Sequence, residues 1–161
     1  MVGSRPAMLS SGRCAAAAAP TSGMACIMEN IADMFEAARR ARANAHAPYS
    51  GFAVGACLAS DDGRLFAGCN VENAAYPQGQ CAEAGAIAAM VAAGARHIAA
   101  VLVLAAGPPL CPPCGGCRQR LAEFAGPDVP VHLCDLAGER RTISLGELLP
   151  LAFTAANFRQ P

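Results

Sequence analysis

Apolar and polar residues follow a helical period in the first patterned part of the chain. Apolar residues recur at steps of three and four from Glu29, and the arginines of this stretch fall between them. The apolar positions are Ile31, Met34, Phe35 and Ala38. This pattern predicts an amphipathic helix, which "HAPYSG" ends. Residues 1–27 mix Gly, Ser, Pro and Ala without a period, so we expect a disordered leader there and one domain over 28–161.

The pattern then changes to that of two short strands. The runs "FAVGACLA" (52–59) and "RLFAGCNV" (64–71) are rich in β-prone residues, and "SDDG" separates them. An Asp-Gly pair between two such runs is a strong hairpin signal. We therefore predict an antiparallel hairpin.

Helices and strands alternate through the rest of the chain. Residues 81–94 are almost entirely apolar, which predicts a helix covered on most sides and ended by Gly94. Further predicted elements are a strand over 98–106, a helix over 114–126, strands over 129–134 and 140–144, and a short helix begun by the capping box of Ser144 and Glu147. This order of elements predicts an α/β layered domain with a central sheet.

Composition narrows the classes of partner. The chain has 161 residues, 54% of them hydrophobic, which suits one core. Its 12 basic residues balance 12 acidic ones, so no excess positive charge attracts nucleic acid or an anionic membrane. No apolar run reaches the roughly 18 residues of a membrane span, and "CAAAAAP" is a weak signal-peptide core. We expect a cytoplasmic protein whose ligand is a small molecule.

The nine cysteines point to metal binding rather than to disulfides. Their number is odd, and Cys57, Cys69 and Cys134 alternate with apolar residues in predicted strands, where a thiol fills the core. In contrast, "LCPPCGGCRQ" places three thiols at two consecutive spacings of three. That is more cysteine than a loop needs for packing, so a metal site is predicted here.

Two predicted helices begin at cysteines. Cys81 stands at the head of one, and Cys114 and Cys117 stand at the head of another. Helix N-termini favour thiolates, and three thiolates on Zn²⁺ leave one tetrahedral position open for water, as in catalytic zinc sites. Glu83 lies in the first turn after Cys81, where it can move protons without binding the metal. An alternative role for Glu83 is that of an acid placed only to favour the helix dipole.

A fourth thiol leaves a second interpretation open. Cys111 could close a structural four-cysteine zinc site with the other three. The Pro112-Pro113 pair stiffens the chain after Cys111 and opposes a chelating turn, so we expect Cys111 to be a bystander.

These motifs resemble those of the zinc-dependent cytidine deaminases. "CAE" at 81–83 is followed by "PCGGCRQ" at 113–119, which is the zinc-deaminase pattern in its three-cysteine form. The likeness extends over "PYSGFAVGA" (48–56), "GCNVENAAYP" (68–77) and "ELLPLAF" (147–153). It covers nearly all of the chain beyond the leader.

The resemblance implies a fold and an activity. The fold would be a three-layer α/β/α domain with a five-stranded mixed sheet, and chains of this length form homotetramers that share site residues. The activity would be the hydrolysis of free cytidine or deoxycytidine to uridine or deoxyuridine and ammonia in pyrimidine salvage. One zinc ion per subunit would be bound by Cys81, Cys114 and Cys117, with Glu83 as the catalytic acid and base. The substrate contacts implied are the backbone of Ala82 and the side chains of Phe52, Asn70, Glu72 and Phe153.

The "NVEN" stretch adds its own argument for a nucleoside. Asn70 and Glu72 lie two apart in a predicted strand, so both would project from one face and suit sugar hydroxyls. Glu72 would also repel a nearby phosphate. The alternative is that the pair only forms a turn at the strand end, and that Phe153 only packs the terminal helix.

One departure from the family pattern affects the metal site. The family commonly has an arginine directly after the catalytic glutamate, whereas this chain has Ala84. We expect helix amides, with Arg118, to offset the thiolate charge instead. Blasticidin-type aminonucleoside deaminases share "CAE" and "PCxxCRQ" and remain an alternative activity, and a non-catalytic structural-zinc module remains a third interpretation.

Overall fold

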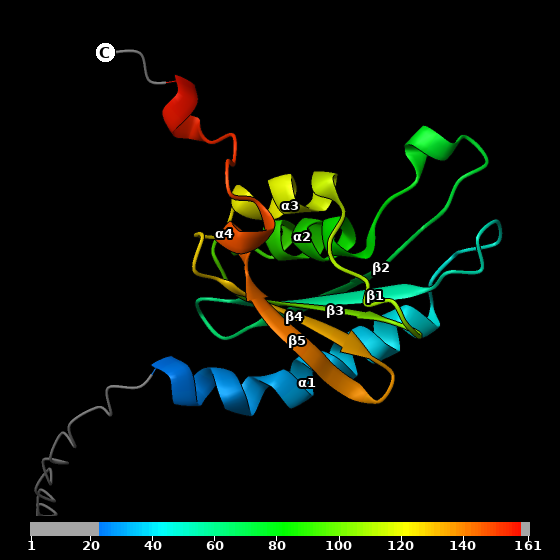
Figure 1. The fold of residues 1–161 in the computed structure, drawn as a ribbon, viewed down its shortest axis with the longest axis horizontal. Coiled ribbons are helices and arrows are strands. Elements are labelled where there is room, and N and C mark those ends of the chain that lie inside the picture. Colours follow the sequence, from blue (N-terminus) through cyan, green and yellow to red (C-terminus); the bar gives the residue numbers. More distant parts are fainter. Residues whose placement is uncertain (1–22, 159–161) are drawn as a thin grey trace, which may run out of the picture.

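A mixed five-stranded sheet forms the middle layer of the protein (Figure 1). The computed structural model describes residues 23–158. The strands are β1 (Val54–Ser60), β2 (Leu65–Cys69), β3 (Ile98–Ala105), β4 (Pro130–Asp135) and β5 (Gly138–Ser144). The helices are α1 (Gly23–Ala43), α2 (Ala82–Ala92), α3 (Gly115–Ala122) and α4 (Leu145–Leu148), with 3-10 turns at Tyr76–Gln78 and Ala155–Phe158.

The sheet has the order β2-β1-β3-β4-β5. The pairs β1–β2, β1–β3 and β4–β5 are antiparallel, while β3–β4 is parallel and is joined through α3. The predicted hairpin is β1–β2, and Gly63 at its turn has a φ of 83°, which glycine adopts without strain. The prediction of a five-stranded mixed sheet is therefore confirmed.

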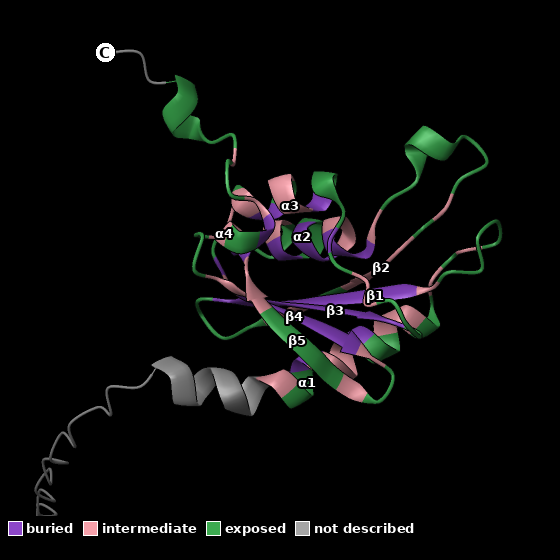
Figure 2. Ribbon diagram, viewed as in Figure 1, coloured by how far each residue is buried: buried purple, intermediate pink, exposed green. Residues whose placement is uncertain are grey.

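Helices cover both faces of the sheet, so the protein has three layers (Figure 1). Successive residues of a strand point to opposite faces, and the central strands are buried on both. In β1, Leu58 packs in the core under α2 and α3, while Cys57 packs in the core against α1. Figure 2 shows most of β1, β3 and β4 as buried. The predicted α/β/α layering is confirmed, and Cys57 and Cys134 fill the core as expected.

The start of α1 and the burial of α2 differ from their predictions. Helix α1 begins at Gly23 rather than at Glu29, and residues 1–22 of the expected leader lie outside the described residues. Helix α2 is less covered than its composition predicts. Ala88, Ala89 and Ala92 are exposed because only one side of α2 meets the sheet. No helix in the described part of the chain is long and apolar enough to cross a bilayer.

Helix α2 lies unusually close to the sheet at Gly68 in β2. A Cβ atom at Gly68 would meet the backbone of α2, at 2.5 Å from the Ala86 nitrogen and 2.9 Å from the Gly85 carbonyl carbon. It would also meet the Ala82 carbonyl oxygen. Glycine therefore lets the first turns of α2 rest directly on β2, which fixes the helix end that carries Cys81.

Candidate active site and metal centre

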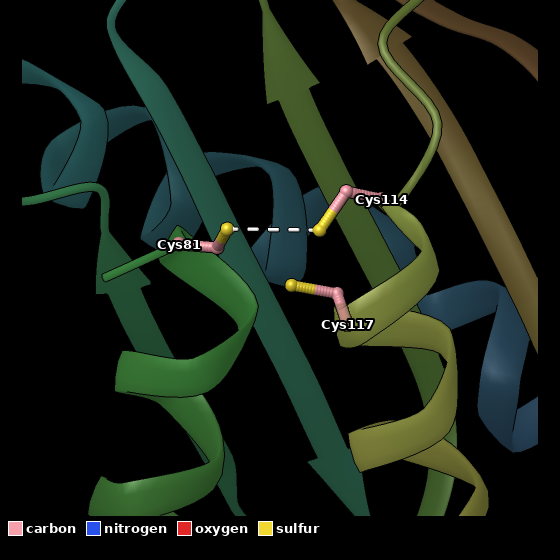
Figure 3. Close-up of side chains that lie close together, drawn as sticks. All are labelled: Cys81, Cys114 and Cys117. Atoms are coloured by element: carbon pink, nitrogen blue, oxygen red, sulfur yellow. Dashed lines mark hydrogen bonds between the residues drawn. The ribbon is translucent and has the colours of Figure 1, made fainter. Parts of the chain in front are cut away.

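Two helix N-termini bring three cysteines together above the sheet (Figure 3). Cys81 is the N-cap residue of α2, and Cys114 is the N-cap residue of α3. Cys117 lies in the first turns of α3 and is buried. The three sulfur atoms lie within 4.8 Å of one another, and those of Cys81 and Cys114 are 3.8 Å apart. Neighbouring helices thus bring together residues that lie more than thirty positions apart.

This donor set fits zinc. With Zn–S bonds of about 2.3 Å in tetrahedral geometry, two sulfurs on one ion lie roughly 3.8 Å apart. The Cys81–Cys114 separation matches that value. Three sulfurs also leave the fourth tetrahedral position without a protein ligand, which is the arrangement of catalytic rather than structural zinc sites.

Glu83 lies beside the sulfur cluster. It occupies the first turn of α2, is only 4% exposed, and its Oε2 is 3.3 Å from the Cys117 sulfur. An acid present only for the helix dipole needs no burial, because the N-terminal field also acts at the surface. A buried carboxylate at the metal ligands favours the predicted role in proton transfer instead.

The three thiols differ in acidity. Burial raises the pKa of Cys81 and of Cys117, and the Glu83 carboxylate raises that of Cys117 further. At Cys114 burial also acts to raise the pKa, but hydrogen bonds from the Cys117 backbone N–H and from the neighbouring thiols outweigh it, so the pKa is lowered. Cys114 is therefore the thiol best prepared as a thiolate, and metal binding must release protons from the other two.

Cys111 lies outside the three-sulfur cluster. Within the described residues, the group able to hold a metal ion consists of Cys81, Cys114 and Cys117 only. Cys111 is half-buried and packs against the core beneath α2 and α3, and burial raises its pKa. This position supports the expectation of a bystander and opposes a four-cysteine site.

Comparisons with known proteins agree with this geometry. Residues 28–133 match the family model described as the cytidine and deoxycytidylate deaminase zinc-binding region. The chain belongs to this family. The cytidine deaminase of Sporosarcina psychrophila is 39% identical over 125 residues, which cover 78% of this chain and 92% of that protein. The cytidine deaminase of Halalkalibacterium halodurans is 43% identical over 122 residues, covering 76% and 92%.

Solved structures of this family have the same fold. The crystal structure of cytidine deaminase from Burkholderia pseudomallei has a TM-score of 0.72 and 45% sequence identity, and the match covers 76% of this chain and 98% of that one. The structure from Mycobacterium tuberculosis has a TM-score of 0.65 at 38% identity. The deaminase resemblance and the zinc cofactor predicted from the motifs are thus confirmed.

Arg118, which we expected to help offset the thiolate charge, hydrogen-bonds to backbone oxygens. Arg118 donates from Nε to the Pro113 carbonyl and from Nη1 to the Leu148 carbonyl, both at 2.8 Å. These bonds direct the guanidinium to backbone oxygens rather than to sulfur. Ala84, where the family commonly has arginine, is half-buried and brings no charge. Arg118 therefore braces the loop before Cys114, and its described hydrogen bonds go to backbone oxygens.

Asn70 and Glu72 lie just beyond the end of β2 at Cys69, two residues short of the predicted strand. Single β-bridges of Val71 with His46 and Gln80 continue the pairing there, so the expectation that Asn70 and Glu72 project from one face stays a prediction. The Asn70 side chain accepts a hydrogen bond from the Val54 N–H at 2.8 Å and donates to the Phe52 carbonyl at 2.9 Å. These bonds add to the backbone bond from the Asn70 N–H to the Val54 carbonyl and tie the end of β2 to the start of β1.

Glu72 organises a turn at an open cleft. Its carboxylate accepts from the backbone N–H groups of Tyr49, at 2.8 Å, and Ser50, at 3.2 Å, and from the Ser50 hydroxyl. The Ser50 hydroxyl and the Tyr49 N–H lower the pKa of Glu72. Glu72 also lines a cleft of about 370 Å³ together with Tyr49, Asn73 and Tyr76. Forming a turn, the alternative role considered for Asn70 and Glu72, is therefore part of what Glu72 does.

The remaining predicted substrate contacts are spread over three regions. Ala82 is buried at the start of α2, between Cys81 and Glu83. Phe52 is 45% exposed just before β1. Phe153 is 57% exposed and stacks edge-on against Phe158, with ring centroids 5.2 Å apart, instead of packing on the terminal helix. Of the predicted residues, the structure brings only the three cysteines, Ala82 and Glu83 into one cluster.

Sequence reasoning missed several residues that support the site. Ser50 and Tyr49 hold Glu72, and Gln119 donates a hydrogen bond to the Phe153 carbonyl at 2.6 Å. "PYSG" and "CRQ" are both inside the motifs that carry the family resemblance, but motif matching alone assigns them no contact. Nothing in the sequence indicated the close contact of α2 with Gly68, except that a glycine lies within a predicted strand.

Proposed function

We propose that this protein catalyses the hydrolytic deamination of free cytidine and deoxycytidine to uridine or deoxyuridine and ammonia, a step of pyrimidine salvage. One observation carries the proposal: a buried carboxylate, Glu83, lies 3.3 Å from a sulfur of a three-cysteine cluster that fits a catalytic zinc ion. A buried acid beside a metal with an open position can both remove and deliver protons.

Each part of the reaction has a group in the site. Cys81, Cys114 and Cys117 would hold zinc, which when bound supplies a hydroxide nucleophile at neutral pH. Glu83 would take the proton that the water releases and pass it to the ring nitrogen as the C–O bond forms at C4. It would then take the proton of the new C4 hydroxyl and deliver it to the amino group, so that C4=O forms as the C–N bond breaks and ammonia leaves. The buried position of Glu83 keeps these protons from exchanging with bulk water.

We further propose that the sugar and base contacts follow the family pattern. The amide of Asn70 keeps a second N–H and a second lone pair after bonding to Phe52 and Val54, and these suit a ribose hydroxyl. Glu72 keeps acceptor positions facing an open cleft. The backbone of Ala82 would bond the pyrimidine, and the rings of Phe52 and Phe153 would line the base. The lack of a phosphate-binding cation among these residues favours a free nucleoside.

Metal analysis coupled to a nucleoside panel tests the proposal. The purified protein should contain one zinc ion per chain, and cytidine should lose its absorbance as equimolar ammonia appears. Glu83→Gln should keep zinc but lower kcat by about 10² to 10⁴. Glu123→Gln makes the same chemical change at an exposed position of the same domain and should leave kcat unchanged.

Three results would contradict the proposal. Full cytidine turnover by Glu83→Gln would show that Glu83 is not the proton carrier. Turnover of blasticidin S but not of cytidine would favour the aminonucleoside alternative. Zinc without any turnover would favour the structural-zinc module.

We also propose a homotetramer that works in the cytoplasm. Exposed aromatic rings after α4, Phe153 and Phe158, and in the cleft, Tyr76, are suited to contacts between copies. The seven described cysteines are all free, and three of them must stay reduced to bind metal, which suits a reducing compartment. Light scattering during size-exclusion chromatography checks the assembly. A monomer with full activity would contradict it.

A further inference from the structure

The segment after α4 has little packing to fix its position. We call Leu149–Phe153 the tail. In Figure 1 the chain beyond α4 leads away from the three layers, and Leu151 is 96% exposed and Phe153 57% exposed. A segment with so few buried contacts has a defined position only where specific hydrogen bonds hold it.

Two consecutive residues of α3 hold the tail at its two ends. Arg118 donates from Nη1 to the Leu148 carbonyl at 2.8 Å, directly before the tail. Gln119 donates from Nε2 to the Phe153 carbonyl at 2.6 Å. Because that partner is a carbonyl oxygen, only the amide nitrogen of Gln119 can face it. Both anchors follow Cys117 directly, so the tail is fastened to the helix that supplies a metal ligand.

Arg118 extends this connection to the metal loop. Its Nε donates to the carbonyl of Pro113, a fully buried residue that immediately precedes Cys114. The Leu148 carbonyl lies at the end of a four-residue helix, where carbonyls lack helical partners. One guanidinium therefore satisfies two backbone oxygens and joins the Cys114 loop to the start of the tail.

We propose that Arg118 and Gln119 are positioning residues, which fasten the tail to α3 and thereby set where the ring of Phe153 is presented to the nucleoside. The inference rests on the proposed function, since it gives Phe153 a place at the substrate. It holds whether the ring serves the site of its own subunit or that of a neighbouring copy, because the anchor lies within one chain.

Gln119→Glu tests the anchor with almost no change of shape. The carboxylate cannot donate to the Phe153 carbonyl and repels it. We expect unchanged zinc content, kcat within about twofold of the wild type, and a KM for cytidine that rises by about threefold to tenfold, the effect of one lost hydrogen bond. Hydrogen exchange of backbone amides in the tail should become faster. Arg120→Gln, an exposed position on the same helix, is the matched control and should change neither KM nor exchange.

A double-mutant cycle separates positioning from general damage. Phe153→Ala should raise KM, and adding Gln119→Glu to it should raise KM no further, because the anchor then has no ring to place. Faster tail exchange with an unchanged KM, or fully additive KM effects, would overturn the proposal, as would unchanged exchange. If the wild type fails to turn over cytidine, the proposed function fails, while the exchange measurement still reports whether Gln119 holds the tail.

Discussion

Replacing Gly68 with alanine tests whether the seating of α2 on the sheet sets the geometry of the site. The added Cβ would lie 2.5 Å from the Ala86 nitrogen and 2.9 Å from the Gly85 carbonyl carbon. These neighbours are backbone atoms of α2, so no change of rotamer relieves the overlap. The helix or the strand must move.

The size of that movement follows from the contact distances. Ordinary van der Waals contact begins at 3.4 Å, so the Cβ and the Ala86 nitrogen must separate by about 0.9 Å, the difference between 3.4 and 2.5 Å. Overpacking of this kind costs about 1–3 kcal/mol of folding free energy. The same end of α2 carries Cys81 and Glu83, and a displacement of about 1 Å at reacting groups lowers turnover by roughly 100-fold.

Gly55→Ala provides the matched control. Its Cβ would overlap the Ala38 carbonyl oxygen and would lie 2.8 Å from the Arg42 Cβ and 3.0 Å from the Ala38 carbonyl carbon, on the α1 side of the same sheet. Urea unfolding should show a similar loss of stability for both variants. Only Gly68→Ala should lose kcat/KM beyond its unfolded fraction. Wild-type kcat/KM in folded Gly68→Ala, or an equal loss in Gly55→Ala, would refute the link between helix seating and catalysis.

Four further predictions follow from individual contacts. Cys111→Ser should retain one zinc ion per chain, whereas Cys114→Ser should lose it on metal analysis, because only Cys114 belongs to the sulfur cluster. Arg118→Lys can satisfy one carbonyl but not two, so zinc affinity measured by chelator competition should fall by about tenfold. Ser144→Ala removes the capping box of α4 and should cost about 1 kcal/mol in urea unfolding. Folding lowers the pKa of Glu72. Its contribution to stability is therefore complete above the ordinary glutamate pKa of about 4.3 and is lost as the pH falls through the lowered value. Glu72→Gln should therefore make the free energy of unfolding fall less steeply at acid pH.

Local patterns were sufficient to predict most of the fold. The Asp-Gly turn, the capping box of Ser144 and Glu147, and the apolar runs of β1 and β3 are each decided by residues near one another in the sequence. The exposed side of α2 could not be predicted in this way. Alanine satisfies a buried and an exposed helix position equally well, so composition does not reveal which side meets the sheet.

The residues of the candidate site also differ in whether local sequence patterns predict their placement. Cys81, Glu83, Cys114 and Cys117 could be predicted because helix heads and metal-ligand spacing are local features, and two such heads need only one packing contact to meet. The hydrogen bonds of the Asn70 side chain to the Val54 N–H and the Phe52 carbonyl join residues 16 and 18 positions apart, and no local pattern encodes them. The contact of Gln119 with Phe153 joins segments 34 residues apart through a side chain, and no periodicity encodes it.

Alanine at position 84 leaves the thiolate charge to be offset by other groups. Three thiolates outweigh the two positive charges of Zn²⁺, and the guanidinium of Arg118 is engaged by two carbonyl oxygens. Cys81 and Cys114 are the N-cap residues of α2 and α3, so both sulfurs lie at the positive ends of helix dipoles, and the Cys117 N–H lowers the pKa of the Cys114 thiol. We therefore expect the partial positive charge of two helix N-termini to offset part of the thiolate charge. This charge belongs to backbone groups, so its effect depends on how firmly α2 and α3 are held in place. Gly68 and Arg118 help to hold them, and therefore support the metal centre electrostatically as well as sterically.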